Sequence, residues 1–401
     1  MKNPGWLQRA VIYQVFIDRF LQGGSHRLRK GSPPEGKPVF CGGNLQGVAE
    51  KLDYLSDLGI NTIWLSPFTQ TVAYHGYHVT DFFRVEKRFG GQNGLQTLVK
   101  TARAHGIRLI MDFVPNHVHV THPWFQEAKR NKRSPYRHWF YWQRNGDYLK
   151  FFGVDEMPKL NLDHPEARKE IIRAAKHWMD QGIDGFRLDF ALGPSLDFWR
   201  EFRDQLKRHD KEVALIAEVY FWRIQRQFLP TINLPDKSFY FLAQQLGLDA
   251  MSAAMKEYAE VFDGLLDFTF QKLLRVFVAN NKRKMSSAQI QEMLDQHYAG
   301  FPDDCSLVSF LDNHDMNRFL FEARGDKARL KRAMEIQFAQ RCPPVIYYGT
   351  ELGMSQTAPV RGNYGDLQAR RMMTWQSRDR SIFNLYKRLI QKRTTLYAST
   401  E

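Results

Sequence analysis

Acidic side chains stand directly after short apolar runs at four places in the chain. Asp112 follows one run and opens the segment DFVPNH, and Arg187 and Asp189 lie within GFRLD. Glu218 follows LIA, and Asp315 closes FLDNHD. A pair of carboxyl groups, one ionised and one carrying a proton, supports nucleophilic and general acid/base catalysis, as in the cleavage of a glycosidic bond.

The local sequence suggests different roles for these acids. Arg187 and Asp189 are two residues apart in a strand, so both face the same side, and the guanidinium group is expected to keep Asp189 ionised, as a nucleophile requires. Glu218 stands among apolar neighbours, which raise the pKa of a carboxyl group and suit a proton donor. Two carboxylates about 5 Å apart would support double displacement with net retention. Asp315 is a third acid that would stabilise positive charge on the sugar.

Each of these acids taken alone has an ordinary structural explanation. A single Asp or Glu after a strand is more often a helix cap or a surface group, and Asp112 could simply cap the following loop. What favours catalysis is that such residues end four of the predicted strands together.

Short β-rich apolar runs alternate along the whole chain with longer segments of helical periodicity. This alternation predicts an α/β fold, a (β/α)₈ TIM barrel, whose catalytic groups project from the carboxyl ends of the strands. Residues 94–106 and 381–393 show helical spacing, and the second is expected to be the closing helix. The eight predicted strands are residues 11–17, 62–66, 107–114, 182–189, 213–219, 265–268, 307–311 and 345–348.

Residues 117–160 interrupt this alternation, because they are rich in aromatic and basic side chains and have no clean period. We therefore expect residues 1–116 and 161–401 to form the catalytic barrel and residues 117–160 to form an irregular inserted domain.

Composition excludes several classes of protein. The chain has 401 residues, of which 43% are hydrophobic and 25% charged, as in an ordinary globular protein. The net charge of +14 comes from dispersed basic residues without a nucleic-acid-binding motif, so we expect no nucleic-acid partner. No apolar run is long enough to cross a membrane and the first residues do not read as a secretion signal, so we expect a cytoplasmic protein with no membrane contact. Three scattered cysteines predict neither disulfides nor a zinc site.

Four segments, at residues 112–117, 185–189, 218–220 and 310–315, resemble the conserved regions of the α-amylase family of glycoside hydrolases. A fifth, MPKLN at 157–161, resembles the form found in neopullulanases and cyclomaltodextrinases. The resemblance implies a retaining hydrolase of α-1,4-glucosidic bonds in maltooligosaccharides, starch or cyclodextrins. An α-glucan transglycosylase is the alternative, and a non-catalytic amylase-like binding subunit is a further one.

Carried over position by position, the resemblance assigns roles to individual residues. Asp189 is the nucleophile, Glu218 the general acid/base and Asp315 the transition-state stabiliser. The substrate-binding residues are Tyr77, His117, Arg187, His314 and Trp222. Trp222 has an equally good structural explanation, since large aromatic side chains often anchor irregular segments.

The chain also departs from the family pattern. It begins almost at the first predicted strand and ends soon after the last predicted helix, so we expect no N-terminal or C-terminal β-sandwich domain, and the sequence leaves the oligomeric state open. Asn116 stands where many amylases bind a structural Ca²⁺, but residues 23–38 contain no Asp or Asn and offer few of the oxygen ligands that Ca²⁺ requires. We expect catalysis to need no metal cofactor.

Overall fold

Eight parallel strands close into a barrel in the computed structural model, which describes residues 3–24, 38–220, 250–282, 284–362, 365–376 and 379–398. Around the barrel the order is β1-β10-β9-β8-β7-β6-β5-β2. Each strand overlaps one of the eight predicted runs, so the predicted (β/α)₈ barrel is confirmed. The strands are β1 Ile12–Val15, β2 Thr62–Leu65, β5 Arg108–Phe113, β6 Gly185–Leu188, β7 Ala214–Ala217, β8 Gly264–Leu266, β9 Ser306–Phe310 and β10 Pro344–Tyr347.

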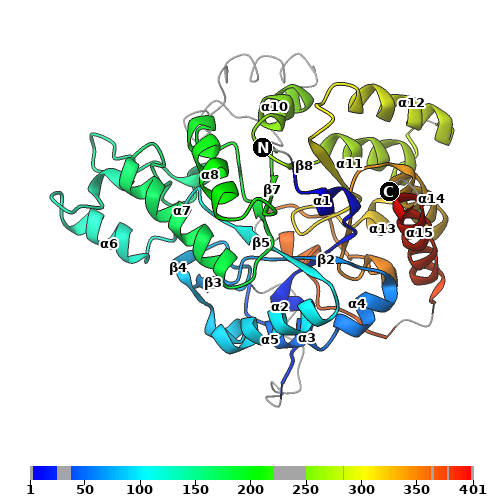
Figure 1. Ribbon diagram of the computed structural model, residues 1–401, viewed down its shortest axis with the longest axis horizontal. Helices are drawn as coiled ribbons and strands as arrows, with labels where there is room; N and C mark the ends of the chain where they lie inside the picture. The colour runs from blue at the N-terminus through cyan, green and yellow to red at the C-terminus, as the bar shows by residue number, and fades with distance from the viewer. Residues whose placement is uncertain are drawn as a thin grey trace.

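Helices surround the barrel, and each strand-to-strand connection carries at least one (Figure 1). The α-helices are α1 Gly5–Arg9, α2 Ile17–Phe20, α3 Leu45–Ala49, α4 Leu52–Leu58, α5 Gly91–Ala104, α6 Pro123–Arg130, α7 Pro165–Asp180, α8 Leu196–His209, α10 Ala250–Ala259, α11 Phe268–Leu274, α12 Ser287–Tyr298, α13 Phe319–Glu322, α14 Lys327–Ala339 and α15 Ser381–Ala398. Shorter turns are η1 Lys87–Phe89, η2 Arg137–Trp139, η3 Phe151–Gly153, the π-helical η5 Arg275–Ala279, η6 Thr350–Leu352 and η7 Gly365–Gln368.

The helices form where capping and apolar spacing agree. In α8 the Ser195 side chain accepts a hydrogen bond from the backbone N–H of Phe198 and starts the helix. Phe198, Trp199, Phe202 and Leu206 then lie buried on one side of α8, facing the barrel. The closing helix α15 packs against α4 and α14, and α14 and α15 lie side by side in Figure 1.

Alternation along the strands divides the core into two layers. Ile12, Trp64 and Ile216 belong to the cluster inside the barrel, whereas Tyr13, Ile63 and Leu215 face the helices. The interior cluster also contains Trp6 and Leu7 of α1, which close the barrel at the amino ends of the strands. The opposite end, where the strands finish, is therefore the end open to a ligand.

Two features of the connections were not predicted from the sequence. β3 Thr69–Thr71 and β4 Val79–Val85 form a separate antiparallel pair between β2 and α5. Within residues 117–160, isolated bridges such as His117 with Lys159 and Phe140 with Leu160 bring the two ends of the segment together.

The aromatic side chains of this segment pack against one another. The ring of Phe125 contacts those of Phe140, Trp142 and Tyr148 at centroid distances of 5.0, 5.7 and 4.7 Å.

In the described part of the chain, no helix combines the length and the apolar character that a membrane span needs.

Candidate active site

The guanidinium group of Arg187 stands at the centre of the acidic side chains at the carboxyl end of the barrel. Its Nη1 donates to Asp112 Oδ1 at 2.7 Å and to Asp189 Oδ1 at 2.8 Å. Its Nη2 lies 2.6 Å from Glu218 Oε1, an ion pair without the angle of a hydrogen bond. Strands β5, β6 and β7 are neighbours in register, Asp112 opposite Arg187 and Leu188 opposite Ala217, so this cluster follows directly from the sheet.

One part of the sequence argument was wrong in its detail. Glu218 was expected in a less charged setting than Asp189, yet both contact the same guanidinium group. Glu218 also accepts a hydrogen bond at Oε2 from the backbone N–H of Phe190, at 3.0 Å. The backbone positions this carboxyl group through its second oxygen, which is what distinguishes it from Asp189.

Burial raises the pKa of each of these carboxyl groups above its ordinary value. The pKa of Asp189 rises to about 7, because desolvation exceeds the opposing effect of Arg187, and the charge of Asp112 raises it further. The pKa of Glu218 also rises to about 7, with desolvation again the largest cause. Three carboxyl groups around one cation favour a state in which the cluster holds at least one proton near neutral pH.

Asp315 lies across the barrel mouth with its own cation. Its Oδ1 accepts from Arg370 Nη2 at 2.8 Å, and its Oδ2 lies 3.0 Å from His314 Nε2. Desolvation raises the pKa of Asp315, but His314, Arg370 and Arg187 together outweigh it and lower the pKa below the usual value. Asp315 is therefore ionised, and its side chain is 46% exposed, open to a ligand.

Tyr77 links the two acidic groups. Its hydroxyl donates to Asp112 Oδ2 at 2.9 Å and lies 2.5 Å from His314 Nε2, and its ring stacks on that imidazole at 5.5 Å. Burial lowers the pKa of His314 to about 3, so the ring is neutral. Gln14 Nε2, from β1, lies 2.8 Å from His314 Nδ1. If the amide donates there, the His314 proton is on Nε2, facing Asp315 and Tyr77.

His117 lies at the same end of the barrel but outside this network. Its ring stacks on Phe151 at 4.6 Å, and its Nε2 is buried with no hydrogen-bond partner among the described residues. Phe190, directly after Asp189, has a left-handed backbone with φ of 44° and packs against Phe151 at 4.9 Å. A non-glycine residue in this conformation costs free energy, and such strain concentrates at functional sites.

The residues around Asn116 do not fit a calcium ion. Asn116 Oδ1 is buried without a hydrogen-bond partner in the described part of the chain, which would suit a ligand. A Cβ on Gly193 would meet that oxygen at 1.9 Å, and the Gly193 carbonyl accepts from Lys159 Nζ at 2.8 Å. This carbonyl is already paired with an ammonium group, whereas Ca²⁺ needs six to eight oxygen ligands.

Of the residues predicted from the sequence, the structure brings together Tyr77, Arg187, Asp189, Glu218, His314 and Asp315. Trp222 lies outside the described residues.

Asp112 is not a loop cap, since its carboxylate accepts hydrogen bonds from Arg187, Tyr77 and Trp64. Sequence reasoning missed Arg370, which follows β10 at a distance and has no local motif, and Gln14, whose position near the end of the first strand was a usable signal.

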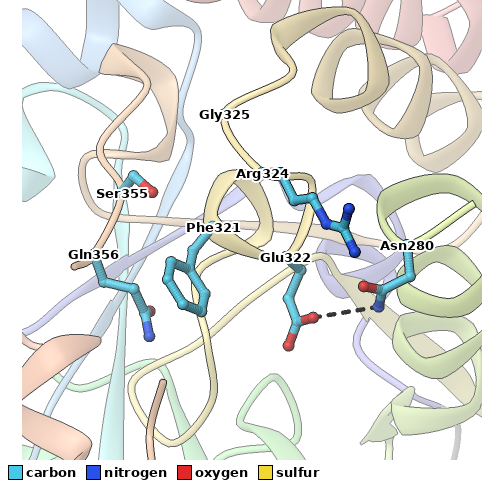
Figure 2. Close-up of a pocket in the computed structure, with 7 residues that line it drawn as sticks. All are labelled: Asn280, Phe321, Glu322, Arg324, Gly325, Ser355 and Gln356. Atoms are coloured by element: carbon cyan, nitrogen blue, oxygen red, sulfur yellow. Dashed lines mark hydrogen bonds between the residues drawn. The ribbon is translucent and has the colours of Figure 1, made fainter. Parts of the chain in front are cut away.

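A separate pocket of about 460 Å³ is lined by residues at the ends of η5 and α13 and by residues that follow η6. Figure 2 shows the Phe321 ring between Gln356 and Glu322, with Asn280 donating to Glu322 Oε2 at 3.2 Å. None of the acidic residues around Arg187 lines it. Asn317, two residues after Asp315, donates to Glu322 Oε1 at 2.8 Å, which connects the wall of this pocket to the Asp315 loop.

Comparison with known proteins agrees with this geometry. A family model described as alpha amylase, catalytic domain, matches residues 14–147 and 144–392. Alpha-amylase 2 of Dictyoglomus thermophilum is 35% identical over 405 residues, covering 99% of this chain and 66% of that protein. A cyclomaltodextrinase of a Bacillus species is 31% identical over 413 residues, covering 97% of this chain and 66% of that protein. The chain thus spans about two thirds of the length of these curated relatives.

Solved structures show the same likeness. One described as cyclomaltodextrinase superimposes with a TM-score of 0.82 at 29% identity, covering 98% of this chain and 64% of that one. The cyclic α-maltosyl-(1→6)-maltose hydrolase from Arthrobacter globiformis gives a TM-score of 0.80 at 26% identity, covering 98% of this chain and 84% of that one.

Proposed function

This chain belongs to the α-amylase family of glycoside hydrolases, and from that premise we propose that it cleaves α-1,4-glucosidic bonds of α-glucans with net retention at the anomeric carbon. One observation carries the proposal: Asp189 and Glu218 both contact the guanidinium group of Arg187 at the open end of the barrel. Because one guanidinium group contacts both carboxyl groups, we infer that they have the short separation typical of retaining enzymes, about 5 Å, rather than the wider gap that admits a water in inverting enzymes.

In the proposed first step, Glu218 gives its proton to the glycosidic oxygen while Asp189 attacks the anomeric carbon. The glycosidic bond breaks, the shortened glucan leaves with the proton, and Asp189 becomes an ester of the sugar. In the second step Glu218, now ionised, takes a proton from water, whose oxygen displaces Asp189 from the same carbon. The ester bond breaks, the sugar leaves with the hydroxyl group of water, Glu218 carries a proton again and Asp189 is again a free carboxylate, so the enzyme returns to its starting state.

The surrounding residues suit the sugar at this position. Asp315 is ionised and exposed, and its negative charge would stabilise the oxocarbenium-like transition state. The partly exposed ring of Tyr77 offers an apolar face to the C–H groups of glucose, while His117 and His314 would donate to its hydroxyls. None of these steps uses a metal, and we propose that the chemistry proceeds without one.

The class of substrate follows from the likeness to cyclomaltodextrinases. We propose maltooligosaccharides and cyclodextrins as substrates, with starch as the longer alternative. The experiment is product analysis on β-cyclodextrin, soluble starch and pullulan, with proton NMR of the first product from maltotriose. We expect the α-anomer first; a β-anomer would overturn the double displacement.

Transfer to a second sugar is the alternative to hydrolysis, because a sugar hydroxyl could replace water in the second step. Products longer than maltotriose in the same assay would favour the transglycosylase.

We expect the hydrolytic activity to survive treatment with EDTA. A loss of activity that Ca²⁺ restores would contradict the metal-free chemistry.

A further inference from the structure

Beside the proposed active site, three side chains of a metal-binding type converge from different segments. The ligand atoms of His78, His119 and Glu156 all lie within 4.8 Å of one another. His78 directly precedes β4. His119 lies near the start, and Glu156 near the end, of the segment 117–160. None of the three belongs to the network around Arg187, so the chemistry proposed above does not explain why they meet.

Their other contacts leave these side chains available. In the described part of the chain, neither His78 nor Glu156 makes a hydrogen bond or ion pair through its side chain. The His78 ring lies beside the rings of His75 and His119, at 4.7 and 5.1 Å. His119 has its Nδ1 2.8 Å from the hydroxyl of Thr121. Its Nε2 is therefore the atom free to bind a metal.

The backbone fixes the three segments in place. The N–H of His119 donates to the carbonyl of Val79 at 2.9 Å, and the N–H of Val120 donates to the carbonyl of Glu156 at 2.9 Å. His78 and His119 are thereby held on adjoining segments of the backbone, with their rings nearly parallel at 24°. The convergence does not depend on long flexible side chains, except for the exposed carboxylate of Glu156.

We propose that His78, His119 and Glu156 bind a zinc ion, with water as the fourth ligand. Two imidazoles and one carboxylate are a ligand set that Zn²⁺ accepts, whereas Ca²⁺ and Mg²⁺ prefer oxygen alone. In a tetrahedral site the ligand atoms stand roughly 3.4 Å apart, so closing the site needs these atoms to approach by about 1 Å and one imidazole to rotate out of its stacked position.

The state of the imidazoles agrees with this site. Burial lowers the pKa of His78 to about 4, and desolvation also lowers the pKa of His119, so both rings are neutral at pH 7. Thr121 has a positioning role. Its hydroxyl can accept from His119 Nδ1, which leaves Nε2 unprotonated for the metal; its backbone N–H, 3.2 Å from Nδ1, favours the other tautomer in the metal-free protein.

Metal binding here would join the inserted segment to the β3–β4 hairpin. His78 follows Tyr77 directly, so the ion would also fix the backbone next to the ring that contacts Asp112 and His314. We expect zinc to raise the temperature of unfolding by a few degrees at saturating concentration. It would leave the acid pair unchanged.

The test uses the full chain, stripped with a chelator and titrated with zinc chloride at pH 7.5 by isothermal titration calorimetry. We expect one zinc ion per chain and lower affinity in His78→Gln and Glu156→Gln, since His78 is half-buried and Glu156 is exposed. Thr121→Val should weaken binding about 10- to 100-fold. His105→Ala is the matched control, because His105 pairs with Asp53 at 2.8 Å on the surface and belongs to no such group of three ligands among the described residues.

Bound Co²⁺ provides a second readout, since a tetrahedral site with imidazole ligands gives an intense visible absorption. The proposal is overturned if zinc binds wild type and the His78→Gln, Glu156→Gln double variant equally, or if His105→Ala removes the binding. A rise in unfolding temperature with Ca²⁺ but not with Zn²⁺ would overturn it too.

Discussion

Each end of the barrel buries a cluster of charged side chains. Carboxyl groups outnumber cations at the carboxyl end, and cations outnumber carboxyl groups at the amino end. At the carboxyl end, Arg187 alone faces Asp112, Asp189 and Glu218. At the amino end, one carboxylate, Asp263, faces two cations, Arg203 Nη1 at 2.5 Å and Lys207 Nζ at 2.9 Å.

The two clusters also differ in whether all of their polar atoms have hydrogen-bond partners. Asp263 Oδ2 also accepts from the backbone N–H of Leu215 at 2.9 Å, so both of its oxygens are paired. At the other end Arg187 retains Nε and Nη2 without hydrogen-bond partners in the described structure, and the carboxyl groups beside it have raised pKa values. The first arrangement stabilises a fold, whereas the second holds a proton that can move.

The largest expected effect is on catalysis at the carboxyl end. Glu218→Gln keeps the shape of the side chain but removes the transferable proton, so kcat should fall by at least about 10³-fold. Steady-state hydrolysis of maltotriose measures this, with circular dichroism to confirm folding. An unchanged kcat would contradict the acid/base role of Glu218 and favour a non-catalytic binding subunit.

The matching substitution at the amino end should act on stability instead. Asp263→Asn leaves Arg203 and Lys207 without their buried counter-charge and should lower the free energy of unfolding by about 3–5 kcal/mol. Urea denaturation measures it. The kcat of the molecules that remain folded should match wild type, and a loss as large as that of Glu218→Gln would erase the distinction between the two ends.

The pH dependence of kcat/KM should report only the carboxyl end. Burial raises the pKa of both Asp189 and Glu218 to about 7, and catalysis needs one proton on the pair. Activity should fall about tenfold per unit of pH on the acid side, where Asp189 becomes protonated, and likewise on the alkaline side, where Glu218 loses its proton.

Two variants sharpen this profile. Glu218→Gln, assayed on an aryl maltoside whose leaving group needs no proton, should lose the alkaline limb and keep the acid one. Asp263→Asn should keep both limbs. A flat profile in wild type between pH 5 and 9 would contradict a shared proton.

The smallest expected effect concerns one hydroxyl. Tyr77→Phe removes the donor to Asp112 and should lower kcat/KM about tenfold, since a hydrogen bond to a charged group contributes about 1.5–3 kcal/mol. Trp6→Phe is the counterpart at the amino end, where the indole donates to the Glu212 carbonyl at 2.9 Å. It should leave kcat/KM unchanged, and an equal loss in both variants would indicate a general loss of stability.

Much of the fold and of the site was predictable because strand periodicity is local. The eight apolar runs predicted the barrel, and the two-residue spacing of Arg187 and Asp189 predicted that they share a face. Neighbouring strand ends then bring Asp112 and Glu218 to the same guanidinium group. The antiparallel β3–β4 pair was missed, since β3 has only three residues and β4, although seven residues long, mixes polar with apolar residues and carries no distinct apolar run.

The sequence by itself determined which acids meet, because strand order and strand ends follow from local patterns. Only the tertiary structure decided which cation each acid contacts and how strongly burial shifts its pKa. It placed Glu218 on the same arginine as Asp189, brought Arg370 to Asp315 from 55 residues away, and set Gln14 beside His314. Desolvation and charge pairing depend on distances between segments far apart in sequence, and those distances exist only once the barrel has closed.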